Sequence, residues 1–148
     1  MTSTGTPSRG AGKTIAFRLK ITDNRAMKKK ILIAEDDDSL RLLYEEELKA
    51  EGYEILSARN GREAIQLLEE TRPDLVLLDI VMPVMDGMEA LGRILRKDRG
   101  IPIILNTSYS AYREDFMSWA ADAYVTKSSD LTELKTKIRD LLEKVKKE

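Results

Sequence analysis

The chain has 148 residues, of which 42% are hydrophobic and 34% are charged, and its formal net charge is −1. This composition suits one compact domain with its own core. A chain without an overall basic charge has no field that would draw it to nucleic acid or to an anionic membrane, so we expect neither partner. No apolar run approaches the ~20 residues that a membrane-spanning helix needs.

The chain contains no cysteine and no histidine. Without cysteine there are no disulfides and no thiolate metal sites, which agrees with a reducing cytosol, so we predict a cytoplasmic protein. Without histidine there are no imidazole bases, no imidazole metal ligands and no phosphohistidine on this chain. Any phosphoryl chemistry must therefore use carboxylates.

The elements are expected in one domain, residues 27–148, which follows an extension at residues 1–26 that is disordered or not native. From residue 30, short apolar runs alternate with amphipathic helical stretches, a pattern that predicts βα units around a parallel sheet. Strands are predicted at residues 31–34, 53–57, 75–78, 103–106 and 123–126. Helices are predicted to end at Gly52, to follow Asn60-Gly61 and Asp86-Gly87, to include a short stretch through Phe116 and Trp119, and to begin at the cap Asp130.

Polar residues follow four of these strands at the point where each strand ends. The carboxyl ends of parallel strands meet at one edge of the sheet, where open α/β folds place their functional sites. Glu35, Asp36 and Asp37 follow the first strand, Asp79 the third, Thr107 the fourth and Lys127 the fifth.

Several carboxylates at one edge would repel one another unless a cation compensates, and Mg²⁺ prefers such oxygen ligands. Asp36 and Asp79 suit that requirement. A carboxylate can attack phosphorus to give an aspartyl phosphate, and Lys127 is placed to offset the developing charge. The hydroxyl of Thr107 could donate to a phosphate oxygen and so detect it.

Residues 30–145 resemble the receiver domain of bacterial two-component response regulators. The resemblance rests on the segments Ile31-Leu32-Ile33-Ala34-Glu35-Asp36-Asp37, Leu77-Leu78-Asp79-Ile80-Val81-Met82-Pro83, Asp86-Gly87, Thr107-Ser108 and Tyr124-Val125-Thr126-Lys127. Each segment alone is weak, but their combination is highly specific. With this resemblance, we expect a flavodoxin-like, doubly wound α/β fold with a five-stranded parallel sheet in the order 2-1-3-4-5 and helices on both faces.

The resemblance implies that Asp79 accepts a phosphoryl group from the phosphohistidine of a sensor histidine kinase or histidine phosphotransfer protein. It implies that Asp36 contacts Mg²⁺ directly, that Glu35 does so through water, and that the carbonyl of Val81 and the carboxylate of Asp79 are further ligands. Mn²⁺ could substitute for Mg²⁺.

The resemblance also assigns the response to phosphorylation. Lys127 would pair with the phosphate, Thr107 would move toward it, and Tyr124 would change rotamer. The altered surface would comprise the fourth predicted helix, which is the stretch through Phe116 and Trp119, together with the fifth strand and the fifth helix. Through this surface the domain would bind an unidentified target and could dimerise. Three details depart from the common pattern: Ser128 follows Lys127 in place of proline, Ser108 follows Thr107, and the interval between Thr107 and Lys127 is short.

The hypothesis is a single-domain response regulator in a phosphorelay, not a turnover enzyme. Two rival functions remain open. One is a Mg²⁺-dependent phosphohydrolase with an aspartyl intermediate, which would want a second acid where Val81 stands. The other is a receiver-like interaction module without phosphotransfer. The presence of the acid pair Glu35 and Asp36, together with Asp79, Thr107 and Lys127, argues against that alternative.

Overall fold

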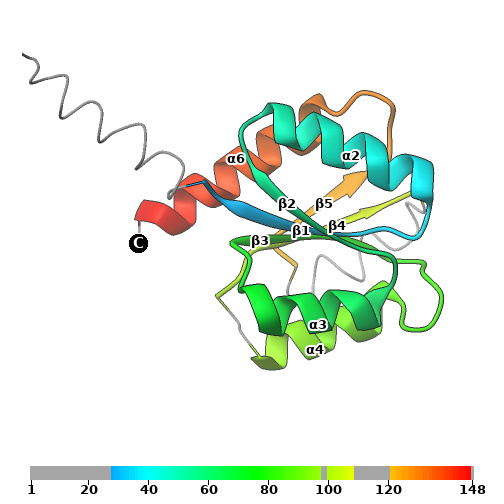
Figure 1. Ribbon diagram of the computed structural model, residues 1–148. Helices are drawn as coiled ribbons and strands as arrows, with labels where there is room; N and C mark the ends of the chain where they lie inside the picture. The colour runs from blue at the N-terminus through cyan, green and yellow to red at the C-terminus, as the bar shows by residue number, and fades with distance from the viewer. Residues whose placement is uncertain (1–27, 98–99, 109–120, 148) are drawn as a thin grey trace, which may run out of the picture.

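The protein is described by a computed structural model that covers residues 28–97, 100–108 and 121–147. One parallel sheet separates two layers of helices, with α2 and α6 on one face and α3 and α4 on the other (Figure 1). The elements are β1 (Lys30–Ala34), α2 (Asp38–Ala50), β2 (Glu54–Ala58), α3 (Gly61–Thr71), β3 (Leu75–Asp79), α4 (Gly87–Lys97), β4 (Ile103–Thr107), β5 (Ala123–Thr126) and α6 (Thr132–Lys147).

The strands run in the order β2-β1-β3-β4-β5, which confirms the predicted doubly wound sheet. All four pairs of neighbouring strands are parallel, and Asp79 on β3 is in register with Asn106 on β4. All five residues of β3 are buried, as its unbroken apolar run predicts for a central strand covered on both faces. This arrangement brings the carboxyl ends of all five strands to one edge of the sheet.

Successive residues of a strand point to opposite faces, and the core divides accordingly. Buried side chains between the sheet and the helices α3 and α4 form one cluster, which includes Leu32, Val76, Leu78, Ile94 and Ile103. Those between the sheet and the helices α2 and α6 form another, which includes Ile33, Tyr44, Leu77, Ile104 and Ile138. The odd-numbered residues of β3 and the even-numbered residues of β4 therefore face the same two helices, α2 and α6.

Turn and cap residues set the helix ends largely as expected. Asn60 caps α3 by accepting a hydrogen bond from the backbone N–H of Glu63, and Gly52 follows α2 with φ of 101°. The second strand begins one residue later than predicted, at Glu54. The last helix also begins later, at Thr132, although the carboxylate of Asp130 still accepts from the N–H of Thr132. Such one-residue shifts are common at element ends.

Two predictions fall outside the described residues: the extension at residues 1–26 and the helical stretch through Phe116 and Trp119. The shortened interval before Lys127 lies largely there as well. Within the described ranges, we find no helix with the length and apolar character that a membrane crossing requires.

Candidate functional site

Three carboxylates meet at the carboxyl edge of the sheet. Glu35 follows β1, Asp79 is the last residue of β3, and each of the two is less than 5% exposed, whereas Asp36 is exposed. One carboxylate oxygen from each of the three lies within 4.8 Å of those of the other two. The sequence prediction that β1 and β3 bring their acids together is therefore confirmed.

Lys127 reaches these acids from the far side of β4. Its backbone N–H donates to the carbonyl of Thr107 at 2.9 Å, which fixes the residue after β5 against the end of β4. Its ammonium lies 2.8 Å from Oε1 of Glu35 and 3.2 Å from Oδ2 of Asp79. The predicted cation is thus in direct contact with the predicted acceptor.

The electrostatics of Asp79 are those of a buried acid beside other acids. Burial, followed by the neighbouring charge of Glu35, raises the pKa of Asp79 to about 7, although the ammonium of Lys127 acts in the opposite direction. Burial also opposes the charge of Lys127, but its contacts with Glu35 and Asp79 outweigh that effect and raise the pKa of Lys127. The site therefore holds a charged lysine beside Asp79, an acid whose ionisation its surroundings disfavour.

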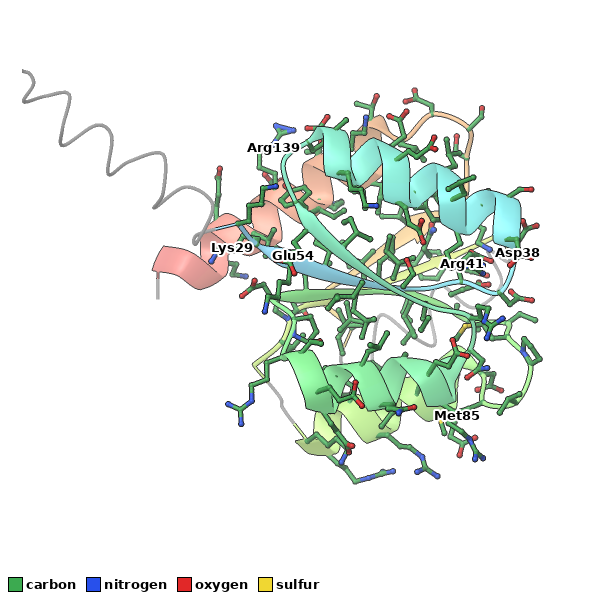
Figure 2. All side chains as sticks on the ribbon, in the orientation of Figure 1. Lys29, Asp38, Arg41, Glu54, Met85 and Arg139 are labelled. Atoms are coloured by element: carbon green, nitrogen blue, oxygen red, sulfur yellow. The ribbon has the colours of Figure 1, made fainter. Side chains whose placement is uncertain are left out.

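The segment that carries the acids is fixed by its own hydrogen bonds. Oε2 of Glu35 accepts from the N–H of Asp37 at 3.0 Å, and the carbonyl of Glu35 accepts from the guanidinium of Arg41 at 2.9 Å. Asp37 also caps α2 through the N–H of Leu40. Figure 2 shows Arg41 beside Asp38, with which it pairs, at the end of the sheet toward which the strands point.

These residues line a pocket of about 270 Å³ that is open to solvent. Its lining consists of Glu35, Asp36, Asp37, Leu40, Asp79, Val81, Ser108 and Lys127. Val81, expected to supply a carbonyl ligand, thus borders the acids, and so does Ser108. A larger cleft of about 450 Å³ lies at the other end of α3 and α4 and includes Glu69, Arg72 and Lys97. Its charged residues do not form a carboxylate cluster, so we place the candidate site at the smaller pocket.

The donor set fits a hard divalent cation. Its candidate side-chain ligands are all carboxylate oxygens. Glu35 and Asp79 are buried but Asp36 is exposed, so there is room for the water molecules that Mg²⁺ retains when it binds proteins. Oε1 of Glu35 is fully buried and, among the residues that the structure describes, its one partner is the ammonium of Lys127. An incompletely compensated buried oxygen of this kind is what a nearby cation would stabilise.

The two predicted switch residues are buried beside the site. Thr107 is the last residue of β4, and Tyr124 on β5 packs in the cluster that faces α3 and α4. By strand alternation Thr107 faces the same side as Tyr124, whereas Asp79 faces the other side. The movement of Thr107 and the rotamer change of Tyr124 stay predictions. The peptide bond between Lys127 and Ser128 is trans.

The loop between β3 and α4 carries Val81 and is closely packed at both ends. The N–H of Gly61 donates to the carbonyl of Met85, and a Cβ on Gly61 would lie 2.5 Å from that oxygen. A Cβ on Gly87 would lie 2.2 Å from the carbonyl oxygen of Asp79. Between these contacts, the exposed Val84 adopts φ of 67°, which is rare for a β-branched residue.

Sequence reasoning missed one buried polar pair near the acids. Nδ2 of Asn106 on β4 donates to the hydroxyl of Tyr44 on α2 at 2.9 Å. The signal was an amide that directly follows the apolar run Ile103–Leu105 and precedes Thr107. It could have indicated a buried hydrogen bond, but the sequence does not name the partner.

The sequence profile of the response regulator receiver domain family matches residues 31–139. Among solved structures, response regulator protein TrrA from Thermotoga maritima in complex with Mg²⁺-BeF is 49% identical and has a TM-score of 0.73; the match covers 76% of this chain and 98% of that chain. TrrA in complex with the histidine kinase ThkA matches at 49% identity with a TM-score of 0.72, over 77% of this chain and 98% of that one.

Curated relatives include both long and short proteins. The probable transcriptional regulator ycf27 of Galdieria sulphuraria is 40% identical over 127 residues, which are 84% of this chain and 49% of that protein. Sporulation initiation phosphotransferase F of Bacillus subtilis is 35% identical over 118 residues, which are 78% of this chain and 95% of that protein. For the ycf27 regulators, the match covers only about half the length of each protein.

Proposed function

We propose that this chain, which belongs to the response regulator receiver domain family, accepts a phosphoryl group on Asp79 from a phosphohistidine and changes its protein-binding surface in response. The observation that carries the proposal is the contact of one ammonium with two buried carboxylates. Lys127 lies 2.8 Å from Glu35 and 3.2 Å from Asp79, beside the exposed acid Asp36. A nucleophile, a charge-compensating cation and a set of metal ligands thus share one pocket.

In the proposed transfer, a carboxylate oxygen of Asp79 forms a bond to phosphorus while the bond from phosphorus to the donor's imidazole nitrogen breaks. The released imidazole keeps that electron pair, and Asp79 becomes an acyl phosphate. Lys127 remains charged throughout, because its pKa is raised, and so offsets the charge on the transferred oxygens. The hydroxyl of Thr107 would then donate a hydrogen bond to one of those oxygens.

Glu35, Asp36 and Asp79 would hold Mg²⁺, together with the carbonyl of Val81. When bound, the ion would offset negative charge on the phosphoryl group and on the acids around it. TrrA, which is 49% identical to this chain, has been solved in complex with Mg²⁺-BeF, and this similarity supports the proposed Mg²⁺ site.

The proposed phosphodonor is a sensor histidine kinase or a histidine phosphotransfer protein. Support comes from TrrA, which is similar to this chain and has been solved in complex with the histidine kinase ThkA. The absence of DNA binding stays a prediction, since several curated relatives are probable transcriptional regulators, and the match covers only about half of each of those proteins. The single-domain state and the cytoplasmic location likewise stay predictions from the sequence.

The test is incubation of the purified protein with acetyl phosphate and Mg²⁺, followed by measurement of intact mass. We expect the wild type to gain one phosphoryl group, and we expect EDTA to prevent the gain. Asp79→Asn should abolish labelling. Asp37→Asn is the matched control, because Asp37 lines the same pocket and asparagine can keep its capping of α2. Labelling that survives in Asp79→Asn, or none in the wild type, would refute the assignment.

The same assay separates the two rival functions. A phosphohydrolase would release many equivalents of inorganic phosphate per protein, whereas we propose that dephosphorylation is slow and that turnover beyond it does not occur. The position two residues after Asp79 is occupied by Val81, which cannot act as a general acid or base. An interaction module without phosphotransfer would show no mass change with any donor, including a phosphorylated histidine kinase.

A further inference from the structure

Tyr44 and Asn106 form a hydrogen bond in the apolar layer between α2 and the sheet. Nδ2 of Asn106 donates to the hydroxyl oxygen of Tyr44 at 2.9 Å, and the two residues are 2% and 1% exposed. An amide buried among apolar side chains is costly unless it is hydrogen-bonded, so this contact fixes the direction of the Asn106 side chain. Loss of the Tyr44 hydroxyl would leave the amide to find another acceptor.

A candidate acceptor lies on the neighbouring strand. Asn106 and Asp79 are register partners on β4 and β3, and by alternation both face α2 and α6. Neighbouring strands lie about 4.8 Å apart, so in-register side chains on the same face can touch. Burial raises the pKa of the Tyr44 hydroxyl, and the hydrogen bond from Asn106 opposes that effect. The charges of Lys127, Glu35 and Asp79 make smaller contributions to the same pKa, which agrees with a hydroxyl close to the acid pocket.

We propose that Tyr44 is a positioning residue that holds the amide of Asn106 away from Asp79, so that the carboxylate stays available to Mg²⁺ and to the phosphoryl group. This inference rests on the proposed function of Asp79. An amide N–H that bonded the carboxylate would occupy an oxygen lone pair that Mg²⁺ or the phosphoryl group would otherwise use, and the carboxylate would then be a poorer nucleophile and a poorer metal ligand.

Three variants test this role. Tyr44→Phe keeps the ring in the core and removes only the hydroxyl. Asn106→Leu removes the amide while keeping the branched shape of the side chain, and the double variant removes both groups. In Tyr44→Phe, we expect the amide to turn to Asp79 and to slow phosphorylation by acetyl phosphate about tenfold, the factor that one charge-assisted hydrogen bond of ~1.4 kcal/mol would give.

The double variant carries the decisive comparison. It has no amide to release, so we expect its phosphorylation rate to return to within about twofold of the rate of Asn106→Leu. A purely structural role would instead make the losses in rate accumulate, with the double variant the slowest of the three. Thermal unfolding of each variant checks that the proteins compared are folded.

Two further readouts do not depend on phosphorylation. In a crystal structure of metal-free Tyr44→Phe, Nδ2 of Asn106 should lie within hydrogen-bonding distance of a carboxylate oxygen of Asp79. Calorimetric titration with Mg²⁺ should show weaker binding in Tyr44→Phe and recovery in the double variant. If the amide keeps its present direction in the crystal, or if Mg²⁺ binding is as weak in the double variant, the inference is overturned. If these readouts hold but the wild type takes up no phosphoryl group, the proposed function fails and the positioning role stands.

Discussion

The two ends of the sheet use aspartates in opposite ways. At the amino end, Asp74 precedes β3, and its carboxylate accepts from the N–H of Lys30, the first residue of β1, at 2.8 Å. Asp122 precedes β5 and accepts in the same way from the N–H of Ile103, the first residue of β4. Each aspartate also donates its own N–H to the carbonyl of the same strand residue. At the carboxyl end, Asp79 is instead buried against Glu35 and Lys127.

The difference shows how one residue type can serve structure or chemistry according to its surroundings. Asp74 is half-buried and Asp122 is exposed, so water still solvates their charges while each satisfies a strand N–H. Asp79 has lost most of its solvation and faces another acid, which disfavours its ionised form. We therefore expect the amino end to contribute stability and the carboxyl end to reduce it in exchange for reactivity.

The largest effect is expected from Asp79→Asn in metal-free protein. Because the pKa of Asp79 is raised to about 7 in the fold, its contribution to stability is complete below the unfolded pKa near 3.8 and is lost as the pH rises through 7. Asparagine stays neutral at every pH. Converting the whole shift gives ~4 kcal/mol, and we expect a gain of about 2 kcal/mol at pH 8, because Lys127 loses one of its partners in the variant.

Urea unfolding in EDTA measures this gain, which should grow between pH 5 and pH 8. Adding Mg²⁺ should narrow the difference between the two proteins, because the ion would bind and stabilise mainly the wild type. A difference in unfolding free energy that does not change with pH would contradict the account.

The second prediction concerns the amino end. Asp74→Ala leaves the N–H of Lys30 without its acceptor and should lower the free energy of unfolding by about 1.5 kcal/mol. Asp122→Ala removes the equivalent bond to Ile103 but at a more exposed site, so we expect a smaller loss of about 1 kcal/mol. Phosphorylation of Asp79 should continue in both variants. Stabilisation by either change would remove the proposed contrast between the two ends.

Much of this contrast could be predicted from the sequence, because it follows from strand pattern. The apolar run Leu75–Leu78 identifies a central strand, and the rule that function gathers at the carboxyl ends then places Asp79 with Lys127. The exact strand limits could not be predicted. Tyr53 has the aromatic character of a strand residue, yet β2 begins at Glu54, since pairing with β1 and not propensity decides the limit.

The missed features depend on contacts between distant segments. Tyr44 reads in the sequence as one more apolar position of an amphipathic helix, and only the packing of α2 on the face of the sheet brings its hydroxyl to Asn106. Asp74 and Asp122 read as ordinary loop residues, because their acceptor role requires the register of neighbouring strands. The conformation of Val84 was equally hidden, since a valine gives no sign of a left-handed backbone.

The smallest effect is expected where the backbone is left-handed. Val84 at the carboxyl end has φ of 67°, and Arg72 at the other end of α3 has φ of 51°. Val84→Gly should stabilise the protein by about 0.5 kcal/mol, because relief of a left-handed β-branched residue slightly exceeds the added entropy of the unfolded chain. The side chain is 70% exposed, so little packing is lost. Arg72→Gly is the matched control and should gain less, since an unbranched residue at a helix C-terminus tolerates this conformation better.

Denaturant unfolding of both variants gives the stability change, and calorimetric titration with Mg²⁺ shows whether it matters to the site. Val84 follows Val81 by three residues in a loop held by Gly61 and Gly87, so added backbone freedom at residue 84 should loosen the expected carbonyl ligand and weaken Mg²⁺ binding. Arg72→Gly should leave Mg²⁺ binding unchanged, because residue 72 lies at the opposite end of α3. Equal Mg²⁺ affinity in the two variants would mean that the strain at Val84 has no part in holding the site, and that the two left-handed residues differ only in local cost.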